Sequence, residues 1–354
     1  MSAALRWLGR HQSSDGTWSS ADYAVRCKDS TCTGKGEQGF DEGVTSLGLL
    51  AFLGAGYTQL SKDIMSDPNV PGVAVAAGEA VKKGLQALIA GQDAEGCIGG
   101  RGPKFLYNHA IATLALCEAY GMTQAPVLRE PAQKAVDFLV GAQNPGSGWR
   151  YGARGGESDT SVTGWAVMAL KSAGLSELPF PRSATDGALA WIDRATDRGP
   201  FPRVGYNEAG SGKVYIPGRN EAFADHPTMS AIGLVSHLFL KKDGRDAALA
   251  NALIADLPAW KVQQIDFYSW YYSTLALYQF DGPSGSHWRG WNELMKNALV
   301  VNQKLPKHGC ENGSWDPSVD RWGSEGGRVY ATAMNAMTLE IYYRYANAFG
   351  TVRR

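Results

Sequence analysis

Apolar and polar positions along the chain recur with the period of a helix, and the helical segments come in pairs. In the third pair, apolar residues stand at i, i+3, i+4, i+7 and i+8 of one helix face, namely Val162, Trp165, Ala166, Ala169 and Leu170. Each pair joins an amphipathic first segment to a second segment rich in small and apolar residues. We predict six helical hairpins, roughly over residues 1–57, 79–122, 131–175, 186–242, 246–281 and 288–346.

Six such hairpins can close into a ring. The apolar second helices would form the inner wall, and the amphipathic first helices would form the outer wall that faces solvent. An open solenoid is the alternative, but a solenoid needs polar capping repeats, and the last hairpin here is among the most aromatic. We therefore predict an all-α chain with a single domain over residues 1–354, folded as an (α/α)6 toroid.

A short polar turn ends several of the first helices. A glutamine is followed by a glycine and a tryptophan at Gln12 and Trp18, again at Gln143 and Trp149, and the tryptophan recurs at Trp315. A glutamine amide can bond the turn backbone while the tryptophan packs under the next helix, which would tie adjacent hairpins together. We predict a structural role for these five residues.

These turns resemble the Gln-Trp repeat of squalene cyclases and of protein prenyltransferase β subunits, most clearly in the first, third and sixth hairpins. The resemblance covers nearly the whole chain and implies the same α/α toroid, with the active cavity at its centre. Because members with different activities share the repeat, it implies the fold more specifically than the chemistry. The ligand that the resemblance implies is an isoprenoid or a similar apolar molecule.

Class II terpene cyclases carry an Asp-x-Asp-Asp-Thr motif at the start of an inner helix, where one acid protonates the substrate. Aligning its final Asp-Thr with Asp159 and Thr160 places Ser158 at the donor position and Gly156 at the first aspartate. Glu157 adds a carboxylate in the variable position, so the resemblance implies a partial acid site. The alternative is that Asp159 only caps the helix that follows.

Protein prenyltransferases bind zinc through an Asp-x-Cys pair and a histidine on the next inner helix. The matching positions here are Asp225, Pro227 and Ser269, so two of the three ligands are replaced. His226 and His109 stand at helix starts, where single histidines more often form hydrogen bonds than bind metals. We expect no metal and no cofactor.

All six second helices begin with polar residues. In a ring of hairpins that run the same way, these starts would converge on one mouth. Crowded carboxylates have raised pKa values, which suit an acid catalyst, although helix starts everywhere prefer acids and amides as caps. The starts carry Asp41, Glu42, Asn108, His109, Glu157, Asp159, Asp225, His226, Asp266, Tyr268, Arg328 and Tyr330.

The candidate site residues come from this rim and from the aromatic residues behind it. The candidate acids are Asp159 and Glu157, with Asp266 and His226 across the mouth. Aromatic faces stabilise carbocations and line apolar cavities, and they equally fill cores or stack on sugars. The candidate ligand-binding residues are His109, Trp165, Tyr268, Trp270, Tyr271, Tyr272, Arg328 and Tyr330.

The composition of the chain argues against some classes of binding partner. Lys+Arg and Asp+Glu both number 34, so with no basic run we expect no nucleic-acid partner. With no run of about 18 apolar residues, we expect no transmembrane segment; peripheral membrane contact stays compatible with the sequence. No signal peptide is evident, the compartment is left open, and the chain is compatible with the soluble domain of a longer or exported bacterial protein.

The five cysteines are too few and too widely spread for a disulfide framework. Reduced thiols are expected. Cys27 and Cys32 are spaced so that they would close a small loop in an exported protein.

Three functions fit these observations. The leading interpretation is a terpene-cyclase- or prenyltransferase-like toroid that binds an isoprenoid in its central cavity, with cyclase-type acid catalysis left open. One alternative is a binding or scaffolding domain that has lost this chemistry and uses its rim or outer wall for a protein partner. The other is a carbohydrate-active toroid, in which paired carboxylates and aromatic residues act on a sugar.

Overall fold

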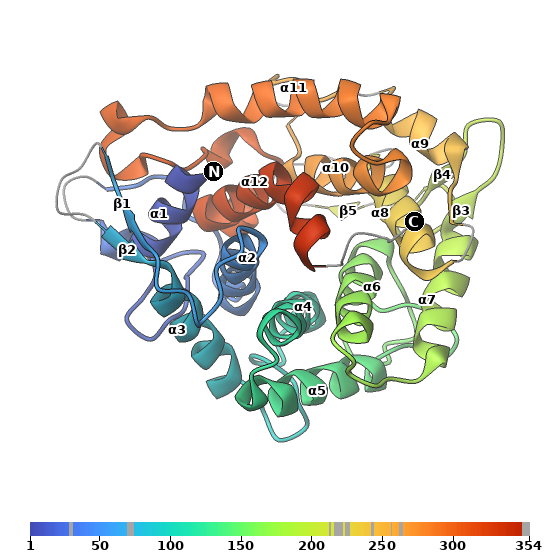
Figure 1. Ribbon diagram of the computed structural model, residues 1–354. Coiled ribbons are helices and arrows are strands. Elements are labelled where there is room, and N and C mark those ends of the chain that lie inside the picture. Colours follow the sequence, from blue (N-terminus) through green and yellow to red (C-terminus); the bar gives the residue numbers. More distant parts are fainter. Residues whose placement is uncertain are drawn as a thin grey trace.

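The computed structural model describes residues 1–27, 31–68, 74–211, 214–215, 222–223, 227–241, 244–255, 257–261 and 265–348. Within these ranges, helices alternate between an outer and an inner ring (Figure 1). The outer helices are α1 (Ser2–Arg10), α3 (Ala77–Ala90), α5 (Pro126–Gly141), α7 (Arg182–Ala195), α9 (Ala247–Leu253) and α11 (Ser286–Asn302). The inner helices are α2 (Asp41–Gly54), α4 (Phe105–Thr123), α6 (Thr160–Leu175), α8 (Pro227–Leu240), α10 (Phe267–Asp281) and α12 (Gly323–Ala348).

The inner ring is closed. Each inner helix packs on the next, from α2 through α4, α6, α8 and α10 to α12, and α12 packs back on α2. The last inner helix also packs on α1, so the first and last hairpins meet along a seam. The predicted all-α (α/α)6 toroid is confirmed, and the open solenoid is not what the chain forms.

Extended segments and tight turns occur only as short pieces in the described connections. Three antiparallel pairs join β1 (Ile64–Ser66) to β2 (Ala74–Ala76), β3 (Thr196–Asp197) to β4 (Arg203–Val204), and β5 (Val214–Tyr215) to β6 (Ala222–Phe223). The 3₁₀ turns are η1 (Tyr23–Arg26), η2 (Pro306–Glu311) and η3 (Pro317–Val319).

Burial explains why the two kinds of helix differ in composition. The inner helices lie between the outer ring and the centre, and α4 is buried almost continuously from Leu106 to Tyr120. An outer helix such as α3 buries one stripe, which includes Val81, Leu85 and Leu88. Among the described helices, none combines the length and the apolar character that crossing a bilayer requires.

The glutamines of the repeated turns bond their own turn, as predicted, and they also bond the next outer helix. The Gln12 amide donates to Gly16 O (2.9 Å) and to Ala80 O in α3 (2.9 Å). The Gln143 amide makes the same two bonds, to its own turn (2.7 Å) and to Ala184 O in α7 (2.8 Å). One side chain therefore satisfies two backbone carbonyls and joins consecutive hairpins.

The tryptophans of these turns are fully buried and bonded to the preceding outer helix. Trp18, Trp149 and Trp315 each donate from Nε1 to a leucine carbonyl, at 2.8, 2.7 and 2.8 Å. In the last turn, Gly313 has φ of 95°, and a Cβ there would lie 2.2 Å from the Ala3 carbonyl oxygen of α1. The turn that links neighbouring hairpins elsewhere thus also closes the ring.

A buried ion pair crosses the ring near the C-terminal ends of the inner helices. Arg344 of α12 contacts both carboxylate oxygens of Glu118 in α4, at 2.8 and 2.7 Å. Its Nη1 also donates to Leu50 O in α2, at 2.7 Å. Three inner helices are tied together there, which leaves the opposite end, where the inner helices begin, for a pocket.

Candidate functional site

A pocket of about 430 Å³ lies at the centre of the ring, where the inner helices begin. Residues at or next to the starts of all six inner helices contribute to its wall, so the predicted convergence of these starts is confirmed. The aromatic lining residues are Phe40, Tyr107, Tyr151, Tyr206, Tyr268, Trp322 and Tyr330. The polar and charged lining residues are Lys104, Asn108, Arg150, Ser161 and Glu325.

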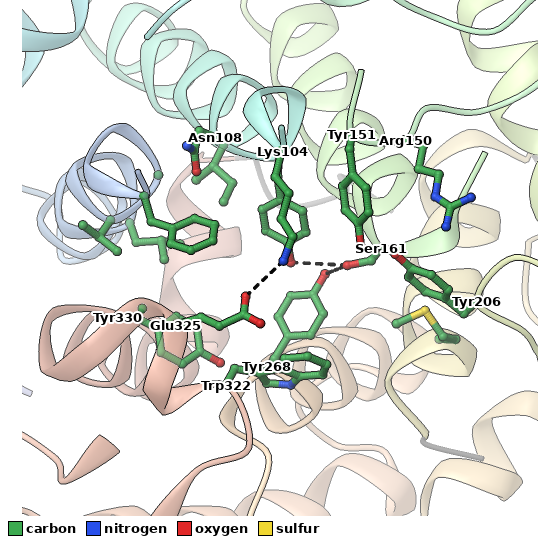
Figure 2. Close-up of a pocket in the computed structure, with 18 residues that line it drawn as sticks. Lys104, Asn108, Arg150, Tyr151, Ser161, Tyr206, Tyr268, Trp322, Glu325 and Tyr330 are labelled. Carbon is green, nitrogen blue, oxygen red and sulfur yellow. Dashed lines mark hydrogen bonds and ion pairs between the residues drawn. The ribbon is translucent and has the colours of Figure 1, made fainter. Parts of the chain in front are cut away.

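Glu325 is the carboxylate among the residues that line this pocket. Gly327, with φ of 67°, turns the chain just after it, and the Glu37 N–H donates to Glu325 O (2.8 Å). The carboxylate points into the pocket and lies 3.7 Å from Lys104 Nζ (Figure 2). Burial raises the pKa of Glu325, and the Lys104 ammonium opposes that rise. The pocket therefore holds a carboxyl group that retains its proton to a higher pH than an exposed glutamate.

Hydroxyl groups from several helices meet across the pocket wall. The Ser161 hydroxyl lies 3.3 Å from the Tyr107 hydroxyl and 3.0 Å from the Tyr268 hydroxyl, which links α4, α6 and α10 (Figure 2). A second pair joins the Tyr151 and Tyr206 hydroxyls at 2.6 Å. These bonds fix the orientation of four tyrosine rings around the pocket.

The Tyr330 hydroxyl is different, because within the described residues it has no hydrogen-bond partner although it is buried at the pocket wall. A buried hydroxyl without a partner is destabilising. A ligand in the pocket that carries a hydroxyl or carbonyl would satisfy it.

Asp159 lies behind this wall rather than in it. It is fully buried, and its Oδ1 accepts a hydrogen bond from the Val162 N–H at 2.7 Å, so the capping interpretation is confirmed. Its Oδ2 lies 3.9 Å from Nε of Arg150, a lining residue that also forms an ion pair with the largely exposed Glu157. Burial raises the pKa of Asp159 to about 7, against the lowering effects of the Val162 amide and Arg150.

We expect the stability of the chain to reflect this buried carboxyl group. The pKa of Asp159 is raised from 3.8 to about 7, so the unfolded chain releases the proton first and stability falls as pH rises from about 4 to about 7. Asp159→Asn keeps a capping oxygen and removes the titration. In urea unfolding at several pH values, the free energy of unfolding of the variant should therefore rise relative to that of the wild type as pH rises.

A matched control is Asp246→Asn, which changes the partly exposed cap of α9, whose carboxylate accepts from the Leu249 N–H at 3.1 Å. At any one pH, this variant measures what the change from aspartate to asparagine costs at a helix cap. Parallel pH curves for the wild type and Asp159→Asn would contradict the raised pKa.

The other candidate acids that the structure describes, Asp266 and Glu157, do not line the pocket. Asp266 is the cap of α10, and its Oδ1 accepts from the Ser269 N–H (2.8 Å) and from Nε1 of Trp322 (3.2 Å), so it orients a lining residue. Glu157 lies at the rim, paired with Arg150. His226 and its neighbour Asp225 lie outside the described residues.

His109 has both ring nitrogens bonded to backbone and is not a lining residue. Nδ1 accepts from the Ile98 N–H (3.1 Å), so Nε2 carries the proton and donates to Ala135 O (3.1 Å). Burial lowers the pKa of His109 to about 4, which keeps the ring neutral. Thr45 and Thr163 accept from the corresponding turn amides in the first and third hairpins. His109 thus takes the place of a threonine in the repeated turn.

The predicted ligand-binding residues divide between the pocket and the packed core. Tyr268 and Tyr330 line the pocket. Trp165 is buried against Tyr271, with ring centroids 6.0 Å apart. Trp270 and Tyr272 are also buried among other rings. Arg328 lies at the seam, where its guanidinium donates to Thr33 O and to the Glu311 carboxylate.

The charged residues that line the pocket were not predicted from the sequence; they are Lys104, Arg150 and Glu325. One signal was available for Glu325. It stands in the segment GSEGG at the start of the last inner helix, which resembles the position of Glu157 in GGESD before the third inner helix. Gly327, with φ of 67°, interrupts α12 two residues later, so Glu325 lies in a first turn that precedes the continuous part of the helix.

Comparison with known proteins finds the same fold in solved structures. No protein-family profile and no curated protein matches the chain. An inactive α-1,6-mannanase variant of Salegentibacter sp. HEL1_6, in complex with α-1,6-mannotriose, is similar in structure (TM-score 0.58, 14% identity, 96% of this chain and 97% of that chain). So is a family 76 glycoside hydrolase (mannosidase) from Bacteroides thetaiotaomicron VPI-5482 (TM-score 0.60, 14% identity, 97% of both chains).

A third similar structure is an unsaturated glucuronyl hydrolase specific for heparin (TM-score 0.60, 12% identity, 99% of this chain and 96% of that chain). At these identities the likeness shows the (α/α)6 toroid and not the chemistry. None of these three is described as a terpene cyclase or a prenyltransferase, so the resemblance seen in the Gln-Trp turns holds at the level of the toroid.

Proposed function

We propose that the chain is a carbohydrate-active protein that binds a glycan in the central pocket and cleaves a glycosidic bond there. The observation that carries this proposal is the composition of the pocket wall. Aromatic rings, aliphatic side chains and hydrogen-bonding and charged groups line one chamber, and the Tyr330 hydroxyl has no partner within the described residues. A sugar offers apolar faces for the rings and hydroxyls for the polar groups.

The charged groups in the wall argue against an isoprenoid in the same pocket. An isoprenoid chain would displace water from Lys104, Arg150 and Glu325 without offering them hydrogen bonds. Desolvation without compensation is unfavourable for polar groups and more so for charged ones. Sugar hydroxyls donate and accept, so they replace the lost water. Among the three functions that fit the sequence, the carbohydrate-active toroid is therefore the one we favour.

In this proposal Glu325 is the general acid. A glycosidase acid must be protonated before it can donate to the leaving oxygen, and burial raises the pKa of Glu325 in that direction. Lys104, 3.7 Å away, stabilises the carboxylate that remains after the proton is transferred. The solved structures of similar fold include a mannanase with bound mannotriose, which supports the proposal by analogy.

Glycoside hydrolysis also needs a second carboxylate. Of the acids expected from the sequence, Asp159 and Asp266 cap inner helices that border the pocket, and each is buried behind a lining residue. Asp159 is our first candidate, because Arg150 lies between it and the chamber. Movement of the arginine toward a ligand would expose Asp159 and remove the burial that raises its pKa, so that it could act as a carboxylate. The sequence of this chain contains no two consecutive aspartates, unlike the pair that is replaced in the inactive mannanase variant.

A ligand panel tests the proposal. The wild-type chain would be incubated with α-1,6-linked manno-oligosaccharides, unsaturated glucuronyl disaccharides and farnesyl diphosphate, with binding measured by calorimetry and cleavage by release of reducing ends. We expect heat and cleavage from at least one glycan and none from the prenyl compound. Trp322→Ala should weaken glycan binding at least tenfold, which corresponds to about 1.4 kcal/mol, because it removes a lining ring.

The control is Phe201→Ala, which removes an aromatic ring that is 86% exposed and lies outside the pocket. It should bind glycan as the wild type does. Binding of farnesyl diphosphate alone would return the isoprenoid interpretation to first place. Binding of a glycan without cleavage would overturn the catalytic part of the proposal and keep the binding part.

A further inference from the structure

Four side chains that can bind a metal meet outside the pocket, at the seam between the first and last hairpins. They are His11, Cys27, Cys32 and Cys310, and one ligand atom of each lies within 4.8 Å of the others. They come from separate segments: the C-cap of α1, the C-cap of η1, the loop after η1, and η2.

The distances within this cluster match a tetrahedral centre. His11 Nε2 lies 3.5 Å from Sγ of Cys27, 3.5 Å from Sγ of Cys32 and 3.3 Å from Sγ of Cys310. Zinc binds thiolate sulfur at about 2.3 Å and imidazole nitrogen at about 2.0–2.1 Å, so tetrahedral geometry places the nitrogen about 3.6 Å from each sulfur. All three nitrogen–sulfur distances lie close to that value.

Hydrogen bonding does not explain why three sulfurs surround one nitrogen. His11 Nδ1 lies 2.8 Å from Trp7 O, a carbonyl that can only accept, so Nδ1 carries the proton. Nε2 then has a single lone pair, which can accept one thiol proton and not three. A cation at the centre gives the nitrogen and all three sulfurs a common partner.

The surroundings hold the histidine in the orientation that a metal ligand needs. The bond from Nδ1 to a backbone carbonyl is the typical outer contact of a ligating histidine, because it fixes the tautomer and the ring plane. The His11 ring stacks on Trp7 with centroids 4.1 Å apart, and Tyr23 packs edge-on at 5.9 Å. The Cys32 N–H donates to Sγ of Cys27 at 3.3 Å, which positions that sulfur.

We propose that His11, Cys27, Cys32 and Cys310 bind one zinc ion in a closed Cys₃His site. Three sulfurs and one imidazole suit zinc among the divalent metals, and four protein ligands leave no open position for catalysis. The five cysteines all remain thiols, and Cys97 and Cys117 stand apart from the cluster. The proposal replaces the expectation of a metal-free chain.

The position of the cluster gives the metal a structural role. His11 and Cys310 are 299 residues apart in the chain, so one ion would link the first hairpin to the last. Direct bonds cross the same seam, from Arg10 to Asn312 O at 3.0 Å and from the Thr33 hydroxyl to Glu311 at 2.8 Å. Because binding requires the folded arrangement of all four ligands, metal affinity adds to the stability of the closed ring.

The test begins with the full wild-type chain, purified with reductant and without chelator, incubated with Zn²⁺ and then desalted. We expect about one zinc per chain by inductively coupled plasma mass spectrometry. Replacement by Co²⁺ should give the visible bands of a tetrahedral site and a thiolate-to-cobalt charge-transfer band. Removing the metal with a chelator should lower the melting temperature by at least about 5 °C.

Two cysteine variants make a matched pair. Cys310→Ala removes one ligand and should lower zinc retention against a competing chelator at least tenfold. Cys117→Ala removes a buried cysteine of α4 outside the cluster and should retain zinc as the wild type does. If Cys310→Ala does not fold, the zinc content and the cobalt spectrum of the wild type still decide the proposal.

Three results would overturn it. The first is a reduced wild-type chain that holds no stoichiometric zinc after loading and desalting. The second is an equal loss of zinc in Cys310→Ala and Cys117→Ala. The third is a disulfide among Cys27, Cys32 and Cys310, found by peptide mass spectrometry of the chain purified without reductant, together with a melting temperature that the chelator does not change.

Discussion

Replacing Glu325 by glutamine is expected to lower kcat, on the glycan that the wild-type chain cleaves, by about 10²–10⁴-fold. Glutamine keeps the size and the hydrogen-bonding capacity of the side chain but cannot donate the proton to the leaving oxygen. KM should change little, because the other lining groups stay in place. Single-turnover and steady-state assays of both proteins would measure the two constants.

The pH profile gives this prediction a second readout. Burial raises the pKa of Glu325, and a general acid is active only while protonated, so wild-type activity should fall as pH rises through that raised pKa. The falling limb should disappear from the residual activity of Glu325→Gln. Lys104→Met should move the limb to higher pH, because Lys104 lowers the pKa that burial raises.

Two further carboxylates serve for comparison. Glu293→Gln changes an exposed glutamate of outer helix α11 and should leave kcat unchanged. Glu157→Gln tests the rim acid that the cyclase resemblance indicated. If Glu157→Gln lost activity as severely as we expect for Glu325→Gln, and Glu325→Gln were active, the assignment of the acid to Glu325 would be wrong.

Arg328→Met is expected to lower the free energy of unfolding by about 3–5 kcal/mol. The guanidinium is fully buried at the seam, where it donates to Thr33 O at 2.7 Å, to Glu311 at 2.7 Å and to the Ser314 hydroxyl at 3.0 Å. Methionine fills a similar volume but leaves the Glu311 carboxylate, which is only 15% exposed, without this partner. Urea unfolding followed by circular dichroism would measure the loss.

The matched control is Arg182→Met. Its guanidinium is 90% exposed and lies 3.5 Å from Asp186, one turn further along α7. Exposed pairs of this kind contribute little to stability, so this variant should unfold at the wild-type urea concentration. Equal midpoints for Arg328→Met and Arg182→Met would show that the buried arginine does not hold the seam.

Local patterns in the sequence were sufficient for the repeating parts of the fold. Gln12 and Gln143 recur at the ends of outer helices, and each makes the bond to its own turn that its position indicated. Asp159 precedes a helix and caps it. Such features depend on neighbours within one hairpin or between consecutive hairpins, where spacing along the chain largely determines distance in space.

The pocket depends on features that spacing does not reveal. Tyr268 and Trp270 are two residues apart on one helix, yet Tyr268 lines the pocket and Trp270 packs against Trp260 instead. Which aromatic residue faces the centre depends on the rotation of the helix about its own axis. Neighbouring helices set that rotation by packing, and every face of these helices is apolar enough to be buried.

The sequence by itself determined the six hairpins, their inner and outer helices and the closed ring, because the period of apolar residues and the repeated Gln-Trp turns are local and occur several times. Only the tertiary structure decided which charged groups face the pocket, such as Glu325 and Lys104, and that His11 meets Cys310. Both are single contacts between residues far apart in the chain. They arise only when the ring closes, and no periodic pattern encodes them.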